Sequence, residues 1–252
     1  MKKEYSFFEN LNFNDFKKMA LDQSLSNSEK IGFPDTYRVG HEEDIFRDIE
    51  SKLPALTVDE SFILDIGCGC SDFPVMLVSR AQVKNQNLFL VDSAEMLSQL
   101  PEIPDRHIRK IPAQYPDCPE LLAQLYGQVD AIIIYSVIQY VFTTGNIFNF
   151  IDKSLELLAP SGRILIGDIP NISMRKRFFS NSTGIEYHQK FTGTAEIPET
   201  KFNRIESNHI DDSVIMAIVA RVRAAGFHAF VVPQSSNLPM ANRREDILIV
   251  RP

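Results

Sequence analysis

The sequence LDIGCGCS, residues 64–71, decides the fold class because it joins a strand pattern to a helical pattern through two glycines. The apolar residues 61–66 predict a buried strand, and residues 72–82 predict a helix. Gly67 allows a tight turn at the end of the strand, and Gly69 lets a ligand approach the backbone closely. The sequence therefore predicts a ligand site at the carboxyl end of this strand.

Short apolar runs alternate with helical patterns along the rest of the chain, which predicts an α/β protein with a parallel sheet. The expected strands are 61–66, 87–92, 107–111, 129–135, 163–167, 228–232 and 246–250, and the expected helices are 72–82, 94–100, 119–126, 147–158 and about 211–225. Residues 233–245 hold two prolines and no helical period, so they are unsuited to a helical crossover between parallel strands. We expect a seven-stranded, mostly parallel sheet with helices on both faces and one antiparallel strand at the C-terminal end.

The alternation breaks in residues 171–210, which are polar and show no clean period. Neither this segment nor residues 1–60 has the apolar pattern needed for a core of its own. We therefore expect one domain over residues 1–252, with its sheet core in 61–170 and 211–252. Residues 1–60 would form a helical cover, and residues 171–210 would form a lid whose aromatic side chains make a small core.

The charge and the cysteine content restrict the classes of partner and the cellular compartment that we expect. The chain has 252 residues with 33 acidic and 26 basic side chains, and its net charge of -7 disfavours a nucleic-acid or anionic-membrane partner. Three cysteines are too few for a disulfide framework, and the odd count suits a reducing compartment. The polar residues 1–6 do not resemble a signal peptide, and the apolar stretch 131–141 is too short for a membrane span. We expect a cytoplasmic protein.

Acidic residues beside the glycines indicate the class of ligand. Asp92 ends the second strand 23 residues after Gly69, near the spacing expected for a carboxylate that binds a ribose. A dinucleotide-binding turn would place a third glycine at position 72, where Asp72 would instead repel a pyrophosphate. Asp65, two residues before Gly67, suits a cationic group. These residues favour a nucleoside ligand without phosphates over NAD.

Four segments resemble, in order, the motifs of the class I S-adenosylmethionine (SAM)-dependent methyltransferases. They are DIGCG (65–69), LVDSAEML (90–97), DAIIIYSVIQYV (130–141) and LLAPSGRILI (157–166). The resemblance covers about residues 61–170, and the expected C-terminal hairpin matches the family's antiparallel seventh strand. It implies a Rossmann-like fold and a SAM cofactor, with S-adenosylhomocysteine (SAH) as product. Two positions depart from the family pattern, Ser71 at the usual third glycine and Tyr140 where a histidine often stands.

The resemblance implies cofactor contacts at matching positions. The expected contacts are Arg38, Asp65, Gly67, Cys68, Gly69, Asp92, Ser93, Met96, Gln114, Ser136 and Val137. The two glycines would line the amino-acid part of the cofactor, Asp92 would hold the ribose hydroxyls, and Met96 would lie near the adenine. Gln114 would reach the adenine edge, and residues 136–137 would border the methionine part. Arg38 would meet the cofactor carboxylate, because a guanidinium suits a carboxylate.

Catalytic residues are harder to assign, because methyl transfer depends largely on proximity and alignment. A hydroxyl acceptor also needs a general base, and the candidates at the expected sheet edge are Tyr140, Asp168 and His188. Asp168 could instead cap a turn, and His188 could be an ordinary surface residue. Cys68 and Cys70 lack a second cysteine pair or a histidine cluster at zinc spacing, so we expect no metal site.

The acceptor is expected to be a polar small molecule, and O-methylation of a sugar- or phosphate-bearing metabolite is favoured. The basic residues 175–177 fall in the lid, where they could bind an anionic acceptor or simply be solvated. Arg243 and Arg244 in the last loop could likewise cover the substrate or be solvated. Three alternatives stay open: an N-methyltransferase of the same class, an NAD-dependent oxidoreductase, and a cofactor-binding module without catalysis.

Overall fold

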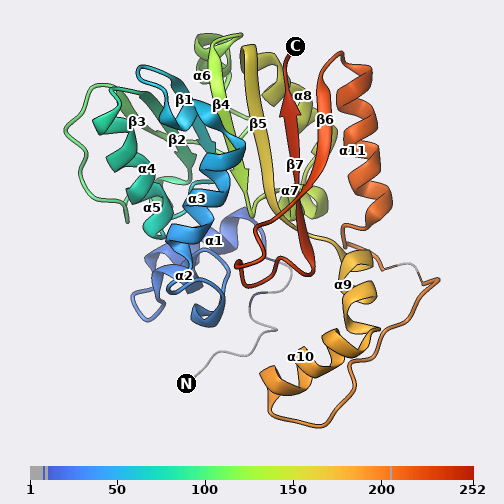
Figure 1. The fold of residues 1–252 in the computed structure, drawn as a ribbon. Helices are drawn as coiled ribbons and strands as arrows, with labels where there is room; N and C mark the ends of the chain where they lie inside the picture. The colour runs from blue at the N-terminus through green and yellow to red at the C-terminus, as the bar shows by residue number, and fades with distance from the viewer. Residues whose placement is uncertain (1–7, 9–10, 205) are drawn as a thin grey trace.

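A single seven-stranded sheet forms the centre of the computed structural model, which describes residues 8, 11–204 and 206–252 (Figure 1). The strands are β1 (Phe62–Ile66), β2 (Asn87–Asp92), β3 (Ile108–Pro112), β4 (Val129–Tyr135), β5 (Leu158–Pro170), β6 (His228–Pro233) and β7 (Arg244–Val250). Their order in the sheet is β3-β2-β1-β4-β5-β7-β6. Strand β7 runs antiparallel to β5 and β6, and the other paired strands are parallel. The predicted sheet is confirmed.

Helices cover both faces of this sheet, because successive strand residues point to opposite sides. The α-helices are α1 (Phe13–Leu21), α2 (Asn27–Lys30), α3 (Glu42–Lys52), α4 (Asp72–Val83), α5 (Ala94–Leu97), α6 (Pro119–Leu125), α7 (Ile138–Thr144), α8 (Ile147–Leu157), α9 (Ile172–Phe179), α10 (Ser182–Thr192) and α11 (Asp212–Ala224), and two short 3-10 helices are η2 (Asp35–Tyr37) and η3 (Pro54–Thr57). Helices α6, α8 and α11 pack on the face that contains Leu64, whereas α3, α4 and α5 pack on the face that contains Ile63.

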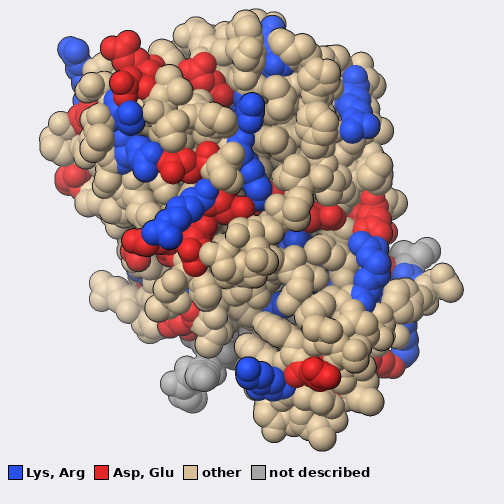
Figure 2. All heavy atoms as spheres, viewed as in Figure 1, with Lys and Arg blue, Asp and Glu red and all other residues tan. Residues whose placement is uncertain are grey.

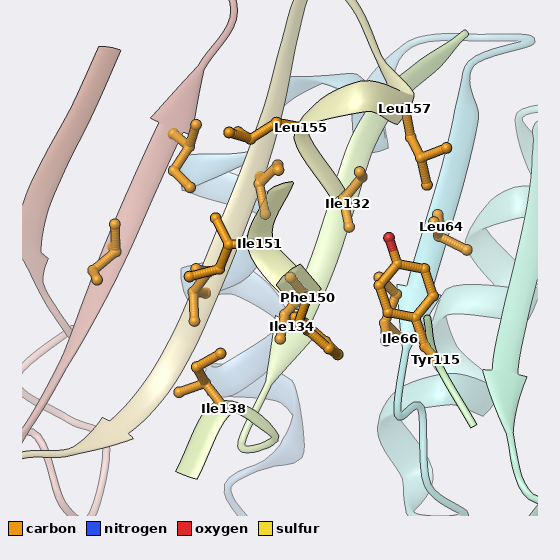
Figure 3. Packing of buried hydrophobic residues seen from close by; sticks show 14 of the residues in the cluster. Leu64, Ile66, Tyr115, Ile132, Ile134, Ile138, Phe150, Ile151, Leu155 and Leu157 are labelled. Carbon is orange, nitrogen blue, oxygen red and sulfur yellow. The ribbon is translucent and has the colours of Figure 1, made fainter. Parts of the chain in front are cut away.

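The buried strands β1 and β4 hold the two apolar clusters together. On one face, Phe150 and Ile151 of α8 pack against Ile132 and Ile134 of β4 (Figure 3). All four side chains are almost fully buried. The continuous apolar pattern of residues 129–135 thus reflects a strand that is covered on both faces.

Two helices lie in the segment 171–210, for which the sequence predicted no regular structure. Asn171 accepts hydrogen bonds from the backbone N–H groups of Ser173 and Met174 and so begins α9. Asn181 accepts one from Gly184 and begins α10. Both helices are short, and their rings pack on one another instead of facing the sheet as an apolar stripe. The aromatic rings of this segment pack on one another as expected, whereas the prediction of an irregular backbone was wrong.

The expected cover and lid lie at the same end of the sheet. In Figure 1, α1 and α2 lie below the sheet on one side, and α9 and α10 project below it on the other. Helix α1 packs against α5, where Lys17 lies 3.3 Å from Glu95. Residues 1–7 and 9–10, including the polar start of the chain, lie outside the described residues.

The distribution of surface charge and the lengths of the helices are relevant to nucleic-acid and membrane binding. Acidic and basic side chains are interspersed over the face shown in Figure 2. Among the described residues, no helix combines the length and the apolar character needed to cross a membrane.

Candidate active site

A cavity of about 390 Å³ opens at the carboxyl ends of β1, β2 and β4. This is the crevice where open α/β sheets bind ligands. Its walls come from the N-terminal cover, the glycine turn, the end of β2, the loop after β3 and the start of α7. Segments far apart in the sequence therefore meet around one space.

Eleven of the fourteen site residues predicted from the sequence line this cavity. They are Arg38, Asp65, Gly67, Cys68, Gly69, Asp92, Met96, Gln114, Ser136, Val137 and Tyr140. Ser93 instead caps α5, where its hydroxyl accepts a hydrogen bond of 3.1 Å from the Met96 N–H. Asp168 lines a smaller neighbouring cavity, and His188 lies on α10 with its ring centroid 5.9 Å from that of Phe179.

The glycine turn has the backbone that its sequence predicted. Gly67 and Gly69 have φ angles of +73° and +68°, in the region that side chains disfavour. A Cβ atom at Gly67 would lie 2.6 Å from Val137, and one at Gly69 would lie 2.7 Å from Ile31. Ser71, at the family's third glycine, has a φ of -74° and caps α4. The turn therefore needs two glycines and not three.

Asp92 closes the turn from the end of β2. Its Oδ2 accepts a hydrogen bond of 3.0 Å from the Gly69 N–H, and its Oδ1 accepts one of 2.7 Å from the Ser93 N–H. Burial raises the pKa of Asp92 to about 6, although both hydrogen bonds oppose this shift. Each carboxylate oxygen keeps a lone pair, so Asp92 can still accept hydrogen bonds from two vicinal hydroxyl groups.

Asp65 is a buried carboxyl group with an unsatisfied oxygen. Its residue is 2% exposed, and among the described residues its Oδ2 has no hydrogen-bond partner. Burial raises the pKa of Asp65 to about 8, and the negative charge of Asp92 adds to this shift. Such a group is costly unless a ligand completes it. A cationic group in the cavity would satisfy the free oxygen and favour its ionised form.

Arg38 reaches the same cavity from the N-terminal cover. Its Nη2 donates to the Ser136 hydroxyl over 2.6 Å and lies 3.3 Å from Asp168 Oδ2. Its guanidinium stacks 4.2 Å from the ring centroid of Phe33. Arg38 is only 5% exposed, and yet its Nε atom has no hydrogen-bond partner among the described residues. One donor therefore remains for an anionic group of a ligand.

Asp168 is the centre of a buried polar network behind the cavity. Arg244 donates to its Oδ2 over 2.7 Å, and the Ser136 hydroxyl donates to the same oxygen. Gln234 donates to Oδ1 over 3.3 Å. Ser136 and Asp168 have φ angles of +60° and +58°, a costly backbone that the surrounding contacts must hold. These contacts favour a role for Asp168 in positioning Arg38 and Ser136 over a role in proton transfer.

Tyr140 lines the cavity beside the N-terminal cover. Its ring lies edge-on to Phe16, with 4.8 Å between the ring centroids. Burial raises the pKa of Tyr140, so its phenol stays protonated at neutral pH. It is suited to donating a hydrogen bond and unsuited to removing a proton.

The charges around the glycine turn disfavour a phosphate group. Asp65 and Asp92 line the cavity, and Asp72 begins α4 directly after the turn. Burial raises the pKa of Glu42, which also responds to the charge of Asp72 and is opposed by Arg38. Four acidic side chains thus surround a helix N-terminus that would bind phosphate in a dinucleotide-binding protein.

Several residues of this site carry no signal in the sequence. Phe33 and Ile31 lie in a segment without a recognisable motif, and Gln234 directly follows the end of β6. Asp246 gives a partial signal, because it is an acid within an otherwise apolar strand and proves fully buried. Its Oδ1 accepts the Asp168 N–H over 2.8 Å.

Comparisons with known proteins were made by sequence and by structure. No protein-family model matches the sequence, and a search of curated proteins found no match. The plantazolicin methyltransferase BamL, solved with a triazolic desmethylPZN analog and SAH, is 15% identical with a TM-score of 0.57, and the match covers 95% of this chain and 97% of BamL. A SAM-dependent methyltransferase from Aquifex aeolicus is 11% identical with a TM-score of 0.53, covering 90% and 99%.

A third similar structure comes from a different kind of methyltransferase. The CurJ carbon methyltransferase is 14% identical with a TM-score of 0.56, and the match covers 97% of this chain and 65% of CurJ. At these identities a structural match reports on the fold. The chain has the Rossmann-like fold of the class I SAM-dependent methyltransferases.

Proposed function

We propose that this protein is a SAM-dependent methyltransferase that acts on a polar small molecule in the cytoplasm. The observation that carries the proposal is the unsatisfied carboxylate of Asp65 in a cavity that also holds Asp92 and the free Nε of Arg38. An ammonium group, a ribose and a carboxylate match these three side chains, and SAM contains all three. The three cysteines are free and buried, which agrees with a reducing compartment.

The cavity suggests a residue for each part of the cofactor. Asp92 would accept hydrogen bonds from the ribose hydroxyls, and Met96 and Gln114 would lie beside the adenine. Asp65 would pair with the ammonium group, and Arg38 would donate to the carboxylate. When bound, SAM supplies a methyl group activated by its sulfonium sulfur. The chain's own part is to fix the approach of the acceptor, which can account for much of the acceleration.

The acceptor atom is a finer question. We propose O-methylation, for which a base must remove the hydroxyl proton. His188 could do so only if α10 approached the cavity, since the residue does not line it. Asp168 is held by two arginines, and Tyr140 is protonated at neutral pH. An amine acceptor must only be neutral to attack the methyl group, so N-methylation is our second candidate.

Calorimetry with SAH tests the proposal. We expect one SAH to bind per chain, and Asp92→Ala to weaken binding by about 100-fold or more, because two charge-assisted hydrogen bonds to the ribose are lost. The control variant is Asp152→Ala, which removes a carboxylate of α8 that pairs with Arg221 of α11 and does not line the cavity. Unchanged affinity in Asp92→Ala would remove the ribose assignment, and an absence of SAH binding would overturn the proposed function.

A further inference from the structure

The basic residues 175–177 of the lid have different environments. Lys176 lies 2.9 Å from Glu206, and Arg177 lies 2.5 Å from Asp212. Both charges are thus neutralised by an acidic neighbour. Arg175, in contrast, pairs with no carboxylate among the described residues. It is exposed to solvent.

A second arginine, Arg243, also pairs with no carboxylate among the described residues and contacts the same ring as Arg175. The guanidinium carbons of Arg175 and Arg243 lie 5.2 Å and 5.9 Å from the centroid of the same Phe179 ring. Arg243 also lies 5.9 Å from the ring centroid of Tyr37 and 5.6 Å from that of Tyr187. Its side chain donates to the neighbouring Asn242 Oδ1 over 2.8 Å. Two positive charges therefore lie within 6 Å of the centre of one aromatic ring.

Two neighbouring guanidinium groups without an anionic partner repel each other. Although Arg175 is exposed, partial desolvation of its guanidinium lowers its pKa and the charge of Arg243 lowers it further, whereas Tyr37 and Glu206 oppose the shift. Contacts with the aromatic rings offset part of this repulsion. An anion between the two arginines would offset it more fully, because a guanidinium binds carboxylate and phosphate oxygens in a matched geometry.

The arginine pair is connected to the candidate active site through neighbouring residues. Tyr37, beneath Arg243, directly precedes Arg38, which lines the main cavity. Arg244, which directly follows Arg243, donates to Asp168, and Asp168 accepts from Ser136 of the same cavity. Cover, lid and last loop therefore meet at this point.

We propose that Arg175 and Arg243 bind an anionic group, a carboxylate or a phosphate, on the methyl acceptor. This inference rests on the proposed function and names the substrate class: a small molecule whose anionic end is held under the lid while its nucleophile points into the cavity. The aromatic rings of Phe179 and Tyr187 shield the anionic group from water on one side and strengthen its attraction to the arginines.

Anion binding to the SAH-saturated protein tests this inference. The probes are inorganic phosphate and acetate, each titrated with chloride adjusted to keep the ionic strength constant. The readout is the midpoint of thermal unfolding, since a ligand that binds only the folded state raises it. We expect at least one probe to raise the midpoint in the millimolar range, and the stronger probe identifies the anionic group. A response no larger than that to chloride would overturn the inference.

Variants locate the site. We expect Arg175→Gln and Arg243→Gln to weaken the anion response by about tenfold or more, because each removes a charged donor. Arg175→Lys and Arg243→Lys keep the charge and should retain most of the response, which separates anion binding from a role of the rings alone. The matched control is Arg177→Gln, two residues along the same helix and already paired with Asp212. Equal responses in all variants would overturn the assignment.

SAH affinity, measured in parallel, separates the two proposals. A wild-type protein that binds SAH but gives no anion response overturns only this inference. A wild-type protein that fails to bind SAH overturns the proposed function. Glutamine variants that bind SAH normally and lose the anion response support both.

Discussion

At the scale of single residues, Asp65 shows how a binding site can reduce the stability of the protein that contains it. The residue is buried, and its Oδ2 has no partner among the described residues. Among the described residues, no side-chain hydrogen bond or ion pair around β1 involves this carboxyl group, and an apolar side chain would avoid the desolvation penalty. We therefore expect a ligand group to pair with the Asp65 carboxyl group.

The raised pKa of Asp65 predicts how stability depends on pH. The folded protein keeps the Asp65 proton up to about pH 8, whereas the unfolded chain loses it near the ordinary aspartate pKa of 3.8. Between these limits the folded state binds more protons, so the free energy of unfolding falls as pH rises, by at most about 1.4 kcal/mol per unit. We expect Asp65→Asn to flatten this dependence in urea unfolding of the ligand-free protein between pH 5 and pH 8.

The same variant should separate stability from binding. At pH 8, Asp65→Asn should be more stable than wild type, yet it should bind SAH more weakly because an amide cannot pair with the ammonium group. Asp152→Asn, at an exposed position, serves as the control and should leave both properties close to wild type. Parallel pH profiles for wild type and Asp65→Asn would contradict the account of this carboxylate.

Asp168 gives a second prediction, on buried charge. Arg38 and Arg244 both pair with it, and Asp168 and Arg38 are almost fully buried. Asp168→Asn leaves two guanidiniums without their anion, so we expect a loss of about 3–5 kcal/mol in the free energy of unfolding. Asp212→Asn breaks the exposed pair with Arg177 and should cost about 0–1 kcal/mol. Similar losses in the two variants, measured in urea, would show that the network is not tightly coupled.

At the scale of elements, the lid depends on how closely α9 and α10 approach each other. Gly184 lies where the start of α10 meets the end of α9. A Cβ atom there would overlap the carbonyl oxygen of Phe178 and lie 3.0 Å from the Cα of Phe179. The close approach allows the lid rings to pack, with 5.7 Å between the centroids of Phe178 and Tyr187.

Gly184→Ala should therefore separate the two lid helices without disturbing the sheet. We expect faster amide hydrogen exchange over residues 172–192 and unchanged exchange in β1 and β4, because local opening can occur without global unfolding. Glu186→Ala, at an exposed position of the same helix, should exchange like wild type. Unchanged exchange over 172–192 in Gly184→Ala would contradict this view of the lid.

Elements with a strong local pattern could be predicted from the sequence, and elements that depend on distant contacts could not. The first apolar strand and the glycine turn follow from the pattern of residues 61–72. The part of the cavity wall that they form was therefore predictable. Helices α9 and α10 escaped prediction because their apolar side chains face each other across a short connection. Strand β5 is longer than the predicted 163–167, since residues outside that range pair with β4 and β7.

The residues of the candidate site also fall into those that the sequence could predict and those that it could not. Motif residues such as Asp65 and Asp92 could be named from the sequence because their spacing from the glycines fixes their place. Arg243 and Arg244 lie in a loop without a pattern, and their roles depend on contacts with Phe179 and Asp168. Such contacts arise only once the last loop folds back over the sheet edge, which no local pattern encodes.

At the scale of the whole molecule, one chain of buried polar contacts joins the cover to the sheet. Lys52 of α3 lies 2.7 Å from Asp246 of β7 and 2.6 Å from Asp48. Asp246 in turn accepts the backbone N–H of Asp168. The N-terminal cover, β5 and β7 are thus linked behind the cavity, which places Arg38 at the ligand site. We propose that residues 1–252 act as one domain for this reason.

We propose that the cavity binds SAM and not a dinucleotide. The most direct test compares SAH with NAD, at equal concentrations, in thermal unfolding of the purified full chain. We predict that SAH raises the unfolding midpoint in a saturable way, while NAD leaves it unchanged because Asp72 and Asp92 disfavour its pyrophosphate. A rise with NAD and none with SAH would contradict the account.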